Sequence, residues 1–445
     1  MVTRDALYAG LGACLLLGAL GCTEAGPLSD DEMQRLKAFQ LQPLPADPSN
    51  TQGDNPKAAQ LGKQLFFDRR FSGPLGPYNS AGVNGSRGPA GASGLVSCAD
   101  CHDPAAGGID HRSLPAATSL GAGYTPRNSP SVINAAYSPL WQFWDGRKDS
   151  LWSQALAPPE GAAEANTSRL AVVHFIAANY AQAYTDVFGP LPDLSDPSRF
   201  PATGKPMDAS WDMMTAADQA TVNGVYANFG KAIAAYERLL TSPNFQPSDF
   251  DRFMAGDKEA MSPAAIRGAR LFIGHAGCAE CHSGPMFTDY KFHNIGAPQT
   301  GQYVPTSDDG RRDVVKGIKD DPFNRNGAFS ESKTDAHFAA FASLTDDQLA
   351  DLDGLFKTPS LRNVSKTAPY MHDGVYADLW AVVNHYDFGG ESGNYAGEKD
   401  PAISPLLLSD GDLDDLIEFL QALEDGPALS STVFPVEGLT APPPP

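Results

Sequence analysis

The sequence predicts a mainly α-helical protein in which one structural unit occurs twice in tandem. Three observations support this prediction. A Cys-x-x-Cys-His motif occurs at residues 98–102 and again at residues 278–282. Similar segments precede and follow each motif, and the chain has almost none of the alternation of apolar and polar residues that strands show. With 445 residues, the chain can form two domains of ordinary size, each with its own core.

Residues 1–22 are expected to be an export signal of the lipoprotein type. Arg4 precedes an apolar run at residues 7–20, which is too short to span a bilayer. Residues 19–22, Ala-Leu-Gly-Cys, resemble a bacterial lipoprotein cleavage site that would leave lipid on Cys22. We therefore expect a periplasmic protein anchored to the membrane through Cys22, and the alternative is plain release into the periplasm.

The first domain is expected at residues 55–245. Residues 23–54 before it are rich in Pro, Asp, Ser and Gln and are expected to be a linker and entry segment. The domain begins with a helix at residues 56–66, because Pro56 has the fixed φ and the missing N–H that suit a helix start. Residues 73–94, rich in Gly, Pro, Ser and Asn, predict a long surface loop before the first motif.

Each Cys-x-x-Cys-His motif is typical of covalent haem binding. The two thiols can form thioether bonds to the vinyl groups of one haem, and the histidine can bind the iron. The expected cofactor-binding residues are Cys98, Cys101 and His102 in the first half and Cys278, Cys281 and His282 in the second. A zinc or redox Cys-x-x-Cys site is the alternative, but neither needs a histidine directly after the second cysteine. The expected fold is therefore two cytochrome c-like helical haem domains in tandem.

The second domain is expected at residues 255–426. It contains a helix at residues 263–272, which Ser262 is expected to cap. The Pro-rich residues 427–445 are expected to form a disordered or polyproline tail.

The helix before each motif contains the sequence Gly-x-x-Leu-Phe, with Gly62 in the first half and Gly268 in the second. A glycine inside a helix costs about 1 kcal/mol relative to alanine. We therefore expect both glycines to permit close helix crossings. The candidate partners are the helices around residues 222–240 and 413–423.

A second repeat follows each motif and indicates that the two haems differ. Counting 13 residues on from Asp373 gives Tyr386, whose oxygen can bind iron. Counting 13 residues on from the equivalent Asp145 gives Pro158, which has no side-chain donor. This comparison predicts a closed haem at His282 and an open one at His102. Because an open iron can bind peroxide, an enzyme is favoured over a plain electron carrier.

Other side chains offer alternatives at both irons. Tyr386 could be an ordinary core tyrosine, with Met371 or His385 as the ligand in its place. His111 could cap the first haem. Four further histidines are expected to be structural (His174 and His293) or at the surface (His275 and His337).

The net charge argues against nucleic-acid binding. The chain has 32 Lys and Arg against 53 Asp and Glu, a net charge of -21, whereas cationic residues supply affinity for nucleic acids. A protein partner guided by charge would present a basic face. The acidic stretch at residues 320–353 is either a partner surface or an insertion.

The sequence resembles the bacterial dihaem cytochrome c peroxidase family and is closer to its MauG-type branch. The resemblance covers residues 54–425, and its motifs are highly specific in combination. It rests on the segments Pro126-Arg127-Asn128, Phe143-Trp144-Asp145-Gly146-Arg147, Ser150-Leu151 with Gln154, residues 356–364 (Phe-Lys-Thr-Pro-Ser-Leu-Arg-Asn-Val) and residues 368–374 (Ala-Pro-Tyr-Met-His-Asp-Gly).

The resemblance implies roles for individual residues. Trp144 matches a tryptophan that relays electrons between the haems. Glu164 matches the acid–base group of the open haem's distal pocket, together with Gln154 and Pro158, and Tyr386 matches the tyrosine that replaces methionine in MauG-type proteins. A calcium ion between the domains is implied at Asn128, Thr367 and Pro369.

The resemblance also leaves the reaction open between related chemistries. The first is reduction of hydrogen peroxide, with electrons supplied through the second haem by a small cytochrome or cupredoxin. The second is MauG-like oxidation of a partner protein, and the third is electron transfer without catalysis. Peroxidases of the family carry a capping histidine where this chain has Ala122, which implies that the first haem is open without reductive activation.

Overall fold

A computed structural model describes residues 26–79, 85–333 and 345–429. The chain is mainly helical, as predicted, with a small antiparallel sheet of strands β1 (Phe292–His293) and β2 (Phe356–Lys357). The expected export signal with Cys22, His337 and most of the Pro-rich tail lie outside the described residues. Among the residues that are described, no helix is long and apolar enough to cross a membrane.

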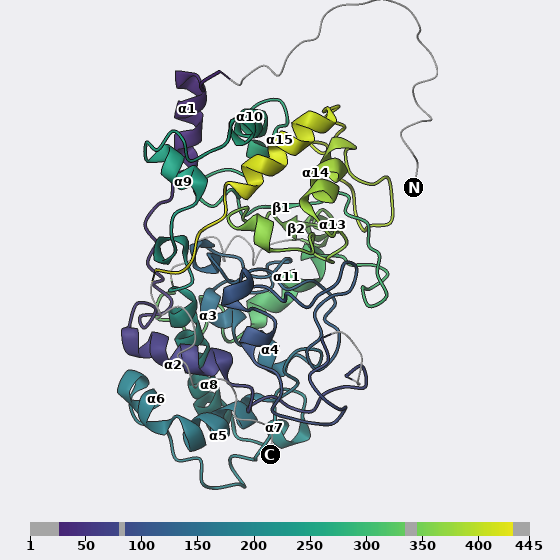
Figure 1. The fold of residues 1–445 in the computed structure, drawn as a ribbon. Coiled ribbons are helices and arrows are strands. Elements are labelled where there is room, and N and C mark those ends of the chain that lie inside the picture. Colours follow the sequence, from purple (N-terminus) through teal and green to yellow (C-terminus); the bar gives the residue numbers. More distant parts are fainter. Residues whose placement is uncertain (1–25, 80–84, 334–344, 430–445) are drawn as a thin grey trace, which may run out of the picture.

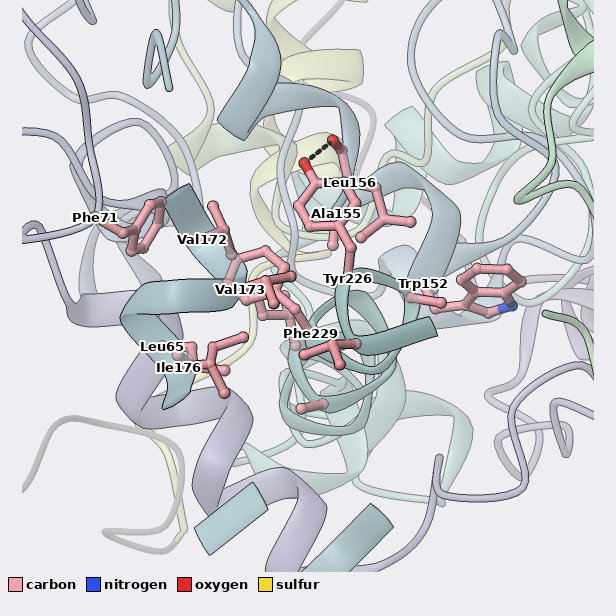
Figure 2. Close-up of a cluster of buried hydrophobic side chains, with 14 of the residues drawn as sticks. Leu65, Phe71, Trp152, Ala155, Leu156, Val172, Val173, Ile176, Tyr226 and Phe229 are labelled. Carbon is pink, nitrogen blue, oxygen red and sulfur yellow. Dashed lines mark hydrogen bonds between the residues drawn. The ribbon is translucent and has the colours of Figure 1, made fainter. Parts of the chain in front are cut away.

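The first half of the chain packs around the long helix α8. The helices of this half are α2 (Pro56–Phe67), α3 (Leu151–Gln154), α4 (Ala157–Glu160), α5 (Arg169–Asn179), α6 (Ala181–Phe188), α7 (Ala209–Asp212) and α8 (Ala216–Glu237). Figure 2 shows part of their shared core, in which Leu65, Val172 and Phe229 from three helices meet. The Tyr226 hydroxyl reaches through this core and donates to the Leu156 carbonyl at 2.6 Å.

The second half forms its own core at the other end of the molecule (Figure 1). Its helices are α9 (Asp249–Met254), α10 (Pro263–Ile273), α11 (Arg311–Asp320), α13 (Asp346–Ala350), α14 (Leu379–Asp387) and α15 (Asp410–Gln421). Helix α10 begins as predicted, because the Ser262 side chain accepts from the Ala265 N–H and Pro263 occupies the first turn.

The predicted helix crossings at the two glycines are confirmed. A Cβ on Gly62 of α2 would lie 1.8 Å from the Ala232 carbonyl oxygen of α8. A Cβ on Gly268 of α10 would lie 1.9 Å from the Asp415 carbonyl oxygen of α15. The two halves thus contain the same pair of crossing helices. In each pair the two helix backbones are in contact at the glycine.

The described part of the expected linker and entry segment, residues 26–54, contributes to both halves. Helix α1 (Asp30–Leu36) buries Leu36 in the second core, where Phe39 also stacks on Phe287 at 4.8 Å between ring centroids. Further along, the Ser49 hydroxyl accepts from the Trp152 indole at 3.0 Å in the first half.

The acidic stretch at residues 320–353 is partly buried, and residues 334–344 of it are not described. Phe323, only 2% exposed, enters the core of the first half and packs edge-on against Tyr226 at 6.0 Å. The Lys231 ammonium donates to the Phe329 carbonyl at 2.7 Å and pairs with Glu331. This part of the stretch therefore holds the second half onto the first.

Candidate haem-binding and catalytic site

The two Cys-x-x-Cys-His motifs adopt the same local structure. Each forms a short 3₁₀ turn, Cys98–Asp100 and Cys278–Glu280. In both, the histidine N–H donates back to the first cysteine's carbonyl at 2.9 Å, between His102 and Cys98 and between His282 and Cys278. In the second motif both thiols and the imidazole line one cavity, whereas in the first motif only His102 is among its lining residues.

Both motif histidines are oriented by a backbone carbonyl. The His102 Nδ1 lies 3.3 Å from the Gly108 oxygen, and the His282 Nδ1 lies 3.0 Å from the Phe287 oxygen. Burial lowers the pKa of each imidazole below its ordinary value. A neutral ring that donates from Nδ1 presents Nε2 to a metal.

A continuous cavity of about 460 Å³ extends between the two histidines. Its walls come from both halves of the chain and include His102, Trp144, Gln154, His282, Lys357 and Tyr386. All four motif cysteines are free thiols, and burial raises the pKa of Cys101 and Cys278 to about 12. Paired thiols, a neutral imidazole at each end and a largely apolar wall fit two covalently bound haems.

The three ligand candidates of the second half differ in their surroundings. His385 has both ring nitrogens engaged, Nδ1 with the Tyr376 hydroxyl at 2.9 Å and Nε2 with the Ile295 carbonyl at 3.0 Å. Tyr386 lies in the cavity wall, where burial and the nearby thiols Cys278 and Cys281 raise the pKa of its hydroxyl. Met371 is also buried in the wall. The geometry thus favours Tyr386 or Met371 over His385.

The first half has an apolar residue both at Pro158, the equivalent of Tyr386, and at Ala122, where a capping histidine is expected in peroxidases of the family. Pro158 lies in α4, and its carbonyl accepts from the Ala165 N–H at 3.1 Å. Ala122 is 1% exposed, and its N–H donates to the Glu164 carbonyl at 2.7 Å. The loop with Ala122 and the segment with Glu164 are therefore neighbours, joined through their backbones.

The two expected distal polar groups lie in different settings. Gln154 lines the cavity shared with His102. Glu164 is not among the lining residues; its carboxylate lies over Gly161, where a Cβ would be 2.2 Å from Oε2. Burial raises the pKa of Glu164, and the charge of Arg147 opposes that shift. The carboxyl is thus favourably set to hold a proton beside the Ala122 loop.

Trp144 lies at the junction of the two halves. Its indole N–H donates to the Asn128 carbonyl at 2.9 Å, and its own carbonyl accepts from the Lys357 N–H at 2.7 Å. Arg127 bridges the same junction, because it pairs with Asp145 and, at 2.6 Å, with Asp308. The indole is therefore held in the wall between the two histidines.

The three residues expected to bind calcium lie close together beside the cavity. The Asn128 amide donates to the Pro369 carbonyl at 2.6 Å, and the Thr367 hydroxyl donates to the Val364 carbonyl at 2.9 Å. Nearby, the buried Asp373 has one carboxylate oxygen without a partner, and burial raises its pKa to about 7. Across the described ranges, no group of three or more His, Cys, Asp or Glu side chains could hold a metal.

The other histidines lie in different surroundings, and His275, His293 and His372 line the cavity. His111 is 57% exposed and lies 3.8 Å from Asp103, so its side chain points to solvent and not to the first haem. His275 is exposed, as expected. His174 contacts two backbone carbonyls, and His293 pairs with Asp400 at 2.7 Å, which agrees with structural roles.

Lys357 is a wall residue that the sequence reasoning did not single out. Burial lowers its pKa to about 8, and its ammonium lies 5.8 Å from the Tyr290 ring centroid. A cation at this position suits the carboxylates of a haem. Lys357 is part of the Phe-Lys-Thr-Pro-Ser segment that supports the family resemblance, but a lone lysine on a strand usually points to solvent, so its burial was not expected.

Comparison with known proteins agrees with this geometry. The family model described as di-haem cytochrome c peroxidase matches residues 56–259. Cytochrome-c peroxidase IdrP1 of Denitromonas iodatirespirans is 33% identical, over 90% of this chain and 90% of that protein. The chain belongs to the di-haem cytochrome c peroxidase family.

Proteins of the MauG type are also among the relatives of this chain. Methylamine utilization protein MauG of Methylorubrum extorquens is 32% identical over 91% of this chain and 89% of that protein. The solved diheme peroxidase BthA of Burkholderia thailandensis has the same fold, with a TM-score of 0.59 and 21% identity over 87% of this chain and 89% of that one. The tandem cytochrome c-like fold is thereby confirmed, and two haems are implied.

Proposed function

We propose that this dihaem peroxidase reduces hydrogen peroxide on the His102 side of the cavity and receives electrons through the His282 side. The proposal rests on a difference between two equivalent positions of the internal repeat. Tyr386, with its oxygen donor, lines the cavity in the second half, whereas the equivalent Pro158 has no side-chain donor. Ala122 is likewise unable to bind iron in the first half.

His102, Cys98 and Cys101 would hold the first haem, and His282, Cys278 and Cys281 the second. A haem held at the first site would supply an iron that can react with peroxide and store its oxidising equivalents. The remaining chemistry falls to side chains of this chain.

Glu164 is proposed to move the proton that O–O cleavage requires. The proton must pass from the inner to the outer oxygen of peroxide, and a carboxyl group can accept it and then return it. The buried setting of Glu164, which raises its pKa, suits a group that must work in both directions. Gln154 would orient the peroxide through its amide, because it lines the cavity that Glu164 does not reach in this state.

Trp144 is proposed to relay electrons between the two sides. It lines the cavity and is fixed by hydrogen bonds to Asn128 and Lys357, which come from different halves. Tyr386 is the proposed sixth ligand of the second haem. A calcium ion on oxygen atoms of Asn128, Thr367 and Pro369 would stabilise the same junction.

The electron donor is proposed to be a small redox protein, a cytochrome or cupredoxin. Its face would be basic, since the chain carries a net charge of -21. The second candidate is MauG-like oxidation of a partner protein, which the 32% identity to MauG and the tyrosine at position 386 favour. We place the protein in the periplasm, with a lipid anchor at Cys22.

Electron paramagnetic resonance of the haem-loaded protein, combined with a cyanide titration, tests the proposal. We expect one high-spin ferric signal beside one low-spin signal, and a Soret shift that saturates at one cyanide per protein. Two low-spin signals with an unresponsive Soret band would show that the vacant site is absent and would leave an electron carrier. A screen of donors with peroxide then separates the two catalytic candidates.

A further inference from the structure

Three tyrosines meet at the surface where the two halves of the chain join. The rings of Tyr124 and Tyr303 stack with their centroids 3.6 Å apart and their planes 7° from parallel. Tyr78 packs edge-on against both rings, at 5.7 Å from each centroid, and is 51% exposed. The cluster is open to solvent on the Tyr78 side, while Tyr124 and Tyr303 are half-buried.

The cluster is connected to the distal side of the first haem site through Tyr124. This residue follows Ala122 by two positions, a span of at most about 7 Å. The Ala122 N–H is bonded to the Glu164 carbonyl at 2.7 Å. The Tyr124 loop is also tied to the cavity wall, because the Ser119 hydroxyl lies 2.8 Å from that of Ser129.

A second connection runs from Tyr303 to the other half of the cavity. Gln299, four residues earlier, lines the cavity, and its amide oxygen lies 3.0 Å from the His372 Nε2. Tyr303 therefore belongs to a segment whose opposite end faces the junction between the two haem sites. Each half of the chain supplies one ring of the stacked pair.

The stacked pair also shares a contact between its hydroxyl groups. Burial and the neighbouring Tyr303 hydroxyl raise the pKa of Tyr124 above its ordinary value. Two phenylalanines would fill the same space and provide the same stacking, worth about 0.5–1.5 kcal/mol. Packing alone thus does not explain why all three rings carry a hydroxyl.

We propose that Tyr78, Tyr124 and Tyr303 form a redox-active surface site at which the enzyme oxidises phenolic donors. Each hydrogen peroxide delivers two oxidising equivalents. The Tyr124–Tyr303 pair gives up one electron to the haem site that peroxide has oxidised and one proton to water, which leaves a tyrosyl radical shared by the stacked rings. A phenol docked against the exposed Tyr78 then transfers a hydrogen atom, so that tyrosine is restored and a phenoxyl radical leaves. A second phenol consumes the second equivalent.

This inference rests on the proposed function and goes beyond it. The site would accept donors that are too large to enter the cavity, since the phenol never approaches an iron. The site would also let the enzyme discharge its oxidising equivalents when no redox protein is bound.

Freeze-quench electron paramagnetic resonance of the haem-loaded full chain, mixed with peroxide and no donor, tests the site. We expect an organic radical signal that narrows when the protein is produced with ring-deuterated tyrosine. The signal should fall at least fivefold, roughly, in Tyr124→Phe and in Tyr303→Phe. Tyr180→Phe is the matched control: its ring packs on Phe175 at 5.8 Å and its hydroxyl donates to Asp68, so the radical should remain.

The same samples separate failure of this inference from failure of the proposed function. If peroxide leaves the Soret band of the wild-type protein unchanged, the proposed function fails and the surface site with it. If the Soret band responds but no tyrosyl radical forms, only the surface site is refuted. The same conclusion follows if the radical signal persists at full amplitude in both Tyr124→Phe and Tyr303→Phe. Covalent haem content and melting temperature show that each variant is folded.

The donor is tested with 2,6-dimethoxyphenol. We expect kcat/KM for its oxidation to fall at least fivefold, roughly, in Tyr124→Phe, and to fall in Tyr78→Phe mainly through a higher KM. Equal kcat/KM values in the wild type and in Tyr124→Phe would mean that phenols are oxidised elsewhere.

Discussion

The backbone next to Glu164, the proposed proton-transfer residue, leaves room for its carboxylate. Gly161 leaves the space that the carboxylate occupies, because any Cβ there would lie 2.2 Å from Oε2. The resulting burial raises the pKa of Glu164, while Arg147 limits the shift. A carboxyl group held in this way keeps a proton more readily than one in water, yet can still release it.

We expect Glu164→Gln to slow the reaction with peroxide by about 10²-fold or more, since general acid–base groups contribute 10²–10⁴-fold. Stopped-flow measurement of the peroxide-induced Soret change provides the rate. Glu259→Gln, at an exposed position, is the control and should react at the wild-type rate. An unchanged rate in Glu164→Gln would remove this residue from the mechanism.

Tyr386→Phe is expected to convert the second haem from low-spin to high-spin, because phenylalanine has no donor atom. Optical and magnetic resonance spectra of the resting protein measure this change. Met371→Leu is the matched variant, since Met371 lines the same wall, and it should leave the low-spin signal in place. The reverse result would identify Met371 as the ligand.

Glu237 is expected to make stability fall as the pH rises. The residue is 3% exposed, one of its carboxylate oxygens has no partner, and burial raises its pKa from 4.5 to about 8. The folded protein therefore binds a proton that the unfolded chain has already lost above pH 4.5. This contribution to stability is complete below pH 4.5 and is lost as the pH rises toward about 8. In Glu237→Gln the drop in melting temperature between these two pH values should be smaller than in the wild type, and an identical drop would exclude Glu237 as its source.

At the residue scale, the sequence could predict side chains that occur in a repeat but not those that meet across segments. Tyr386 and Pro158 could be compared because each lies 13 residues after an Asp-Gly pair. The tyrosine cluster could not be foreseen, because positions 78, 124 and 303 belong to three loops that share no periodicity. Only the folded chain brings those rings together.

The repeated helix pair, α2 with α8 and α10 with α15, is the main structural element of each half. Gly62 and Gly268 let a helix approach the backbone of its partner, as the cost of a mid-helix glycine suggested. The sequence could predict this element because both helices carry the same Gly-x-x-Leu-Phe pattern. It could not predict the crossing residues Ala232 and Asp415, since each is contacted through its backbone carbonyl, which no side-chain pattern marks.

Gly62→Ala should destabilise the protein by about 3 kcal/mol or more, because overpacking a core typically costs 1–3 kcal/mol and here the clash is with backbone. Gly224→Ala, on α8, is the matched control, since its Cβ would meet only a Phe329 ring atom at 3.9 Å. That variant should be neutral or more stable by up to about 1 kcal/mol. Thermal unfolding followed by circular dichroism measures both, and equal melting temperatures would contradict a tight crossing at Gly62.

For the whole molecule, the two halves exchange parts of their cores. Leu36 and Phe39, from the start of the chain, are buried in the second core, whereas Phe323, from beyond the second motif, is buried in the first. The sequence could not predict this exchange. The acidic residues around position 323 indicated a partner surface or an insertion, and the composition of residues 23–54 indicated a linker and entry segment.

Phe323→Ala should destabilise the first half by about 3–5 kcal/mol, the usual cost of removing a buried phenylalanine. Differential scanning calorimetry of the haem-loaded protein measures the effect. Phe388→Ala, at a position that is 57% exposed, is the control and should melt close to the wild type. If the two variants melt alike, Phe323 does not contribute to the core of the first half.

The exchange of core residues has a consequence for how the protein is made. A ribosome releases the chain from its N-terminus, so the first half lacks Phe323 until both Cys-x-x-Cys-His motifs have been synthesised. A fragment that ends after the first half would lack Phe323, and one that begins at the second half would lack Leu36 and Phe39, so neither unit can complete its packing alone. Each half of the newly made chain therefore finishes folding only once the other has been supplied.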